Sequence, residues 1–138
     1  MNILVVTVLS GSASSDKDVL KKVLMEMKRR DPDIVSIILA NREGLEIASD
    51  LESGEDSLLL SAMIASLYAM GVKTVAQMNR GPFSKLIISG ENGSVLIVGD
   101  KDSDIVMGLI LRDQANLGLA LIEVKRAFGR ILKQLKST

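Results

Sequence analysis

Residues 57–78 read SLLLSAMIASLYAMGVKTVAQM, a stretch that is apolar almost all the way round a helix. At about 100° per residue it divides into three strips. The first strip is mostly bulky and consists of Leu60, Ile64, Leu67, Gly71, Val75 and Met78. The second is mostly small and consists of Leu58, Ala62, Ala65, Ala69, Val72 and Ala76. The third mixes polar and apolar residues and consists of Leu59, Met63, Ser66, Met70, Lys73, Thr74 and Gln77.

Two apolar strips on one helix predict two packing partners. A helix on the outside of a monomer needs only one apolar stripe, which faces the core. We expect a sheet to receive the bulky strip and a second helix to approach the small strip. The stretch therefore predicts a chain that pairs with another, and it places the function in the paired surface.

Composition excludes several kinds of chemistry. The chain has 138 residues, enough for one domain, and its 17 basic and 17 acidic residues give a net charge of zero. That balance gives no global reason to expect nucleic acid or an anionic membrane as a partner. Without Cys or His the chain lacks thiols and the usual general base, so we predict no catalytic residue, cofactor or metal ion. We expect a cytoplasmic domain with no membrane span, because no run reaches about 18 apolar residues.

The remaining segments alternate between helix and strand patterns. Tight turns join neighbouring strands, and the pair Asn92-Gly93 is the strongest hairpin signal among them. Such turns mean antiparallel pairing, so the sequence predicts an α+β fold. In order, the expected elements are a helix at 16–30, strands at 34–40 and 45–49, the long helix at 57–78, strands at 85–89, 94–98 and 105–111, and a helix at 117–136.

The first fifteen residues are treated as an extension ahead of the domain at 16–138. Ile3–Leu9 is apolar and β-branched, which predicts a buried strand or an apolar tail, and Ser10–Ser15 predicts a flexible turn. A strand, a Gly/Ser loop and a helix in that order could cradle a phosphate. This alternative, a nucleotide- or flavin-binding protein, predicts a parallel sheet starting at Ile3. The loop fits neither the Walker pattern nor G-x-G-x-x-G.

Three aspartates, Asp100, Asp102 and Asp104, resemble the start of a calcium loop. Such a loop also needs Gly at its sixth position and Glu at its twelfth, where this chain has Ile105 and Leu111. We therefore interpret the segment as an acidic hairpin turn.

The strand expected at 85–89 supplies a second argument for pairing. If it lies at a sheet edge, its unpaired backbone is an aggregation hazard that pairing with a second copy removes. Together with the small strip, it predicts a twofold dimer with a continuous sheet. The predicted interface residues are Leu58, Ala62, Ala65, Ala69, Val72, Ala76, Leu86, Ile87 and Ile88.

The order of elements resembles the roadblock/dynein-light-chain family, in its prokaryotic branch of regulators of Ras-like GTPases. The resemblance covers 16 to about 136 and rests on SIILANREGLEIASD (36–50), LLLSAMIASLYAMGVKTV (58–75), LIISGENGSVLIV (86–98) and above all LILRDQANLGLALIEVKRAFGRI (109–131). It implies a profilin-like, five-stranded antiparallel sheet between the long helix and the two terminal helices. It also implies homodimers, or heterodimers with a paralogue, that act as non-enzymatic scaffolds or regulators of small GTPases.

The mixed strip is then the candidate surface for a Ras-like GTPase, through Leu59, Met63, Ser66, Met70, Lys73 and Gln77. Exposed methionines favour an adaptable contact surface, although the dimer itself could cover the same strip. A further alternative is a small-molecule sensor, which needs a pocket with convergent polar groups; a filled core would dismiss it.

Overall fold

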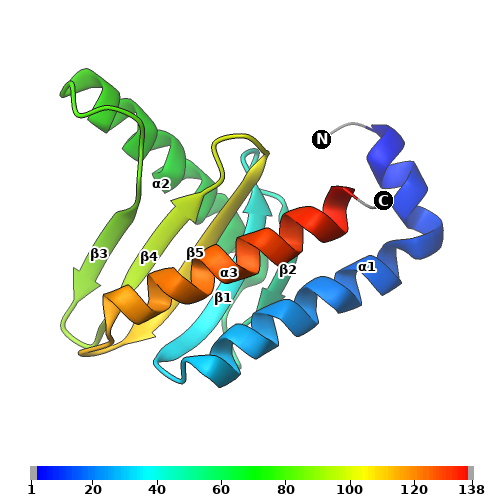
Figure 1. Cartoon of the computed structure of the whole chain (residues 1–138), viewed down its shortest axis with the longest axis horizontal. Helices are drawn as coiled ribbons and strands as arrows, with labels where there is room; N and C mark the ends of the chain where they lie inside the picture. The colour runs from blue at the N-terminus through cyan, green and yellow to red at the C-terminus, as the bar shows by residue number, and fades with distance from the viewer. Residues whose placement is uncertain (1–2, 137–138) are drawn as a thin grey trace.

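The computed structural model describes residues 3–136, with side chains from Asp16 onward. The strands form one sheet in the order β2-β1-β5-β4-β3, and all neighbouring strands are antiparallel. Helices α1 and α3 lie side by side on one face, and α2 lies on the other (Figure 1). The predicted fold and element order are confirmed. In chain order the elements are α1 (Ile3–Arg30), β1 (Ile34–Asn41), β2 (Glu46–Asp50), α2 (Ser57–Gln77), β3 (Leu86–Gly90), β4 (Gly93–Gly99), β5 (Ile105–Arg112) and α3 (Leu117–Lys136).

The two faces of the sheet carry separate hydrophobic clusters. The larger cluster lies under α1 and α3 and includes Leu24, Leu109 and Ile131, all fully buried. The smaller cluster lies under α2 and is made of Ile38, Ile64, Tyr68, Ile97 and Val106. Alternation along β1 and β5 explains the division, because successive side chains of a strand point to opposite faces.

Capping side chains explain where the helices begin. The Asp56 carboxylate accepts hydrogen bonds from the backbone N–H groups of Leu58 (3.0 Å) and Leu59 (3.2 Å). The Asn116 side chain accepts one from the N–H of Leu119 (3.1 Å) at the start of α3. These bonds satisfy backbone donors that the first turn of a helix leaves without a partner.

Two glycines let α2 approach the sheet closely. A Cβ atom at Gly108 in β5 would overlap the Ile64 side chain, and one at Gly99 would overlap the Tyr68 ring. Ile64 of the bulky strip and the neighbouring Tyr68 therefore meet the sheet where the sheet itself has no side chain, whereas Met78 at the end of the strip is exposed.

The N-terminal expectation needs correction. The structure describes α1 as one helix from Ile3 to Arg30, so neither the strand or tail at Ile3–Leu9 nor the turn at Ser10–Ser15 is observed. A strand needs a partner to satisfy its backbone, whereas lengthening a helix adds one internal bond per residue. Gly11 costs the helix only about 1 kcal/mol, which is too little to stop it. That residues 1–15 form an extension to the domain stays a prediction.

The nucleotide- or flavin-binding alternative is wrong on topology. It required a parallel sheet beginning at Ile3, and the sheet is antiparallel and begins at Ile34. Without a strand–loop–helix cradle, Ser10–Ser15 does not open a helix N-terminus toward a phosphate.

Candidate functional site

Strand β3 is a true sheet edge, as the pairing argument required. It pairs with β4 on one side, with Leu86 opposite Ile97 and Ile88 opposite Val95, and is last in the strand order. Ile87 and Ile88 are large apolar residues, yet Ile88 is 42% exposed. An exposed apolar edge strand is unusual in a monomer, because it can pair with further strands.

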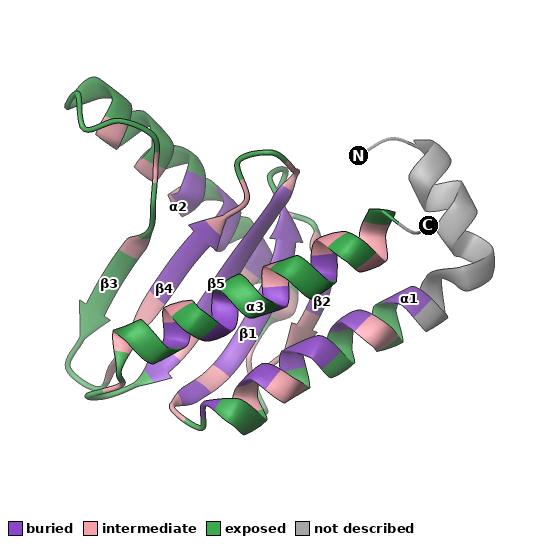
Figure 2. Cartoon of the chain, in the orientation of Figure 1, coloured by how far each residue is buried: buried purple, intermediate pink, exposed green. Residues whose placement is uncertain are grey.

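Helix α2 exposes most of its surface. Met70 is 63% exposed, and every residue of the candidate GTPase-binding set is exposed. Figure 2 shows that the exposed half of α2 extends past the ends of the strands. Phe83, in the connection to β3, packs edge-on against Tyr68 with ring centroids 5.2 Å apart. This contact fixes the overhanging half of the helix.

The predicted dimer residues fall into two groups. Leu58, Ala62, Ala69, Val72, Ala76, Ile87 and Ile88 are exposed, and Leu86 is half-buried. Ala65 is only 5% exposed, because it lies beside Gly44 in the β1–β2 turn. Ala65 is therefore already covered by its own chain, and its part in the dimer interface stays a prediction.

An apolar groove of about 240 Å³ lies between α2 and the sheet. The sequence analysis did not predict this groove. The signal that could have indicated it is that β5 carries apolar residues on both of its faces. Its lining residues are Leu60, Met63, Ile64 and Leu67 from α2, with Ser36, Ile38, Leu51, Ile88, Val95, Gly108 and Ile110. The core under α2 therefore leaves a space, and the sensor alternative required such a space. Yet Ser36 is the one polar residue of the lining, so convergent polar groups are missing.

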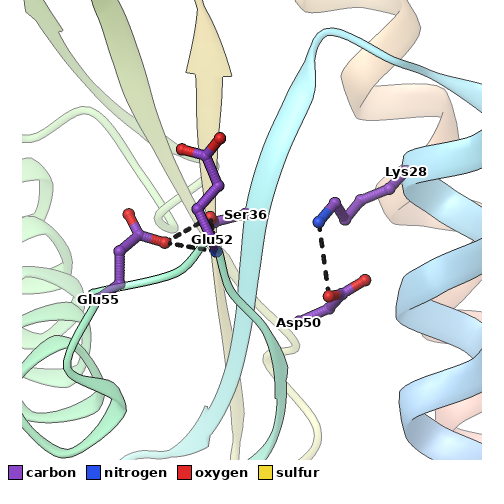
Figure 3. A network of polar contacts seen from close by, with 5 residues as sticks. All are labelled: Lys28, Ser36, Asp50, Glu52 and Glu55. Carbon is purple, nitrogen blue, oxygen red and sulfur yellow. Dashed lines mark hydrogen bonds and ion pairs between the residues drawn. The ribbon is translucent and has the colours of Figure 1, made fainter.

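Ser36 is already engaged in the polar network of Figure 3. Its hydroxyl donates to Glu55 Oε1 (2.5 Å) and accepts from the backbone N–H of Glu52 (3.0 Å). On the other side of the sheet, Lys28 Nζ lies 3.5 Å from Asp50 Oδ1. The network ties the β2–α2 loop to β1 and so fixes where α2 begins.

The acidic loop between β4 and β5 forms a structural turn. Asp104 Oδ1 accepts the backbone N–H of Arg42 (3.0 Å), and the Asp100 N–H donates to the carbonyl of Ile105 (3.1 Å). Arg42 also donates to the carbonyl of Asp100 (3.1 Å). Within the described residues, no three His, Cys, Asp or Glu side chains gather closely enough to hold a metal ion.

By length and composition alone, α2 is long and apolar enough to cross a membrane, a test that core helices of folded domains also pass. It spans 21 residues, and an 18-residue window within it has a mean hydropathy of 1.6. However, the helix packs along one face against strands of its own sheet, with Ser61, Ile64, Ala65 and Tyr68 buried. Its remaining apolar surface is better explained as a protein contact.

Comparisons with known proteins agree with the fold. A model of the Roadblock/LC7 domain matches residues 20–110. The uncharacterized protein MJ0310 of Methanocaldococcus jannaschii is 31% identical over 113 residues, which cover 81% of this chain and 96% of that protein.

Two solved structures share the architecture. MglB of Myxococcus xanthus superposes with a TM-score of 0.76 at 18% identity, covering 86% of this chain and 96% of that one. A Roadblock/LC7 domain from Streptomyces avermitilis superposes with a TM-score of 0.68 at 14% identity, covering 85% and 92%. At such identities the likeness concerns the fold, and the sequence match carries the family. The chain belongs to the Roadblock/LC7 family.

Proposed function

We propose that this chain is a non-enzymatic, cytoplasmic scaffold that dimerises, binds a Ras-like small GTPase, and modulates the nucleotide cycle or location of that GTPase. The observation that carries the proposal is the set of exposed apolar side chains on α2 and the edge strand β3, among them Leu59, Met70 and Ile88. Monomers rarely leave such a surface uncovered, so it favours a protein partner. The family resemblance adds the expectation of a GTPase.

The dimer is proposed to form by antiparallel pairing of β3 with β3 of a second copy. A twofold axis there would extend the sheet and bring both α2 helices onto the same face. The overhanging half of α2 would then reach over the apolar groove of the other copy. Ala69, Val72 and Ala76 are the small, exposed residues on that half, and they suit a close helix approach. A paralogue with the same edge could replace the second copy.

The GTPase is proposed to dock on the mixed strip, with Met63, Met70 and Lys73 as its central contacts. Methionine side chains adapt to a partner surface, and a lysine supplies charge at the rim. Docking there would bias the mobile switch loops of the GTPase, which set its nucleotide state. Met63 also lines the groove, so Met70 is the cleaner probe of this contact.

The first experiment measures the mass in solution at several concentrations by sedimentation or light scattering. We expect a stable dimer at micromolar concentration. A monomer throughout would refute the pairing, because the small strip and β3 would then have no second copy to meet.

The second experiment is a pull-down with Ras-like small GTPases of the same organism, loaded with GDP or with a non-hydrolysable GTP analogue. We expect Met63→Asp combined with Met70→Asp to abolish capture. Met25→Asp is the matched control, because Met25 is equally exposed but lies on α1. Capture that survives the double change would exclude the mixed strip as the docking face.

The apolar groove supports a second candidate function, the binding of an apolar small molecule. Its volume of about 240 Å³ would take a small hydrocarbon-like ligand, although no polar group would fix the orientation. Fluorescence of a hydrophobic dye tests this function. We expect the dye to bind in the groove and to weaken dimerisation. A dye signal equal for the wild type and for Leu60→Trp, which puts a larger side chain into the groove, would dismiss it.

A further inference from the structure

The zero net charge of the chain hides a strong separation of charge. Helices α1 and α3 together hold eleven basic and four acidic residues, a net charge of +7. The rest of the chain holds six basic and thirteen acidic residues, a net charge of −7. Because α1 and α3 form one layer, the positive charge lies on one side of the molecule (Figure 1).

The acidic residues of this layer hardly reduce its surface charge. Glu123 is buried, and Asp16 is buried where it accepts a hydrogen bond from Gln134 Nε2 (3.0 Å). Glu26 is held by Arg30 (3.1 Å) and Arg130 (2.8 Å). Among the described side chains of the two helices, Asp18 is the one exposed carboxylate, against ten exposed Lys and Arg side chains.

The same layer exposes apolar side chains among its positive charges. Met25, Leu119 and Ile122 are all exposed, and Ile122 is flanked on α3 by Lys125 and Arg126. In addition, the first residues of α1, Ile3–Leu9, are apolar by sequence. A helical surface that combines basic rows with apolar residues is typical of proteins that lie in the interface of a bilayer.

The composition of the layer favours lipid over nucleic acid. Basic residues bind the phosphates of nucleic acid, but stable single-strand binding adds aromatic side chains that stack on bases, and sequence recognition adds polar side chains that read base edges. In the described part of α1 and α3, Phe128 is the sole aromatic residue, and it packs against the core. Apolar side chains such as Ile122 gain nothing from a phosphate backbone, whereas they can insert among acyl chains.

We propose that the α1–α3 layer docks on bilayers that contain anionic phospholipids. Basic residues bind the headgroups electrostatically, and the exposed apolar residues enter the interface. This surface lies on the face of the sheet opposite α2, so docking leaves the exposed face of α2 free. The inference depends on neither the dimer nor the GTPase.

The test is co-sedimentation of the full chain with vesicles of equal parts phosphatidylglycerol and phosphatidylcholine, compared with pure phosphatidylcholine. We expect binding to the anionic vesicles at about 50 mM salt, and at least a tenfold loss at about 500 mM because salt screens the headgroups. The combined variant Lys22→Glu and Lys125→Glu should abolish binding. The matched control, Arg80→Glu with Lys101→Glu, makes the same change of charge on exposed residues outside the layer and should bind as the wild type does.

Three results would overturn the proposal. They are absence of anionic-vesicle binding by the wild type at low salt, an equal loss in the control variant, and tighter binding to duplex DNA than to the vesicles. All four positions are exposed, and circular dichroism of both variants checks that each is folded.

Discussion

The two faces of the sheet differ in how their helices cover them. Under α1 and α3 the core is large and filled, and the outer surface of those helices is charged. Under α2 the core is small, a groove remains, and the outer surface of the helix is apolar. The first face buries a large core within the chain beneath a mainly basic surface, whereas the second has the makeup of half an interface between proteins. The following predictions test this difference, from the largest expected effect to the smallest.

The largest effect is expected from a cavity in the filled core. Ile131 is 0% exposed under α3, so Ile131→Ala should lower the free energy of unfolding by about 2–5 kcal/mol. Met70→Ala on α2 should change it by less than about 0.5 kcal/mol, because Met70 is exposed. Urea unfolding at a concentration where the chain is monomeric measures both. Similar losses of unfolding free energy for the two variants would mean that the two faces contribute equally to the stability of the monomer.

The second effect concerns association and leaves folding intact. Ile88→Lys puts a charge on the exposed edge strand, and we expect the dimer dissociation constant to rise by roughly 30-fold or more, as for an interface hot spot. Leu45→Lys is the matched control, because Leu45 is equally apolar and exposed but lies next to β2 at the opposite edge. Sedimentation at several concentrations gives both constants. If Leu45→Lys were the more disruptive change, pairing would have to occur through β2.

The third effect compares two buried serines, Ser36 on β1 and Ser61 on α2. Ser36 and Ser61 are both 0% exposed. Ser36 bonds Glu55 and Glu52, whereas the Ser61 hydroxyl has no partner among the described residues. Ser36→Ala should therefore cost about 1–3 kcal/mol of unfolding free energy, and Ser61→Ala should be neutral or stabilising. Thermal unfolding measures the two changes, and a larger loss for Ser61→Ala would show that its hydroxyl has an essential partner.

Much of the fold could be predicted because local signals agreed with one another. The apolar strips of 57–78 indicated the long helix and the Asn92-Gly93 pair indicated the β3–β4 hairpin, and the structure confirms both elements in the expected order. The family match covers 20–110, so it leaves out most of the segment 109–131 on which the resemblance most depended. The structure nevertheless has the expected strand and helix there.

The features that could not be predicted depend on how elements far apart in the sequence pack together. The start of α1 was misjudged because β-branched residues favour a strand only when another strand is present to pair. Ala65 belongs by sequence to the small strip, yet contact with the β1–β2 turn buries it. Net charge is a sum over the chain and cannot reveal that α1 and α3 bring their basic residues onto one side.

The smallest effect is expected at the seam between α1 and α3, where Glu26 forms ion pairs with Arg30 and Arg130. Hydrogen bonds from Arg130 and Arg30 lower the pKa of Glu26 from its ordinary value of 4.5. A carboxylate with a lowered pKa stabilises the fold at pH values above 4.5, and this contribution is lost as the pH falls through the folded value. We expect Glu26→Gln to be slightly less stable than the wild type at neutral pH and equal to it in acid. Glu91→Gln, at an exposed position in the β3–β4 turn away from this contact, is the control for the loss of one carboxylate.

Added salt should affect the stability contributed by this seam and the pairing through the α2 face in different ways. The Glu26 contribution is electrostatic and only partly shielded from solvent, so it should shrink further at about 1 M salt, where the screening length is about 3 Å. Pairing through β3 and α2 is mainly apolar, and salt should leave it unchanged or strengthen it. Measuring the unfolding midpoint and the dimer constant along one salt series therefore tests both faces at once. A dimer that dissociates with added salt would mean that charged residues, and not the apolar strip, hold the two copies together.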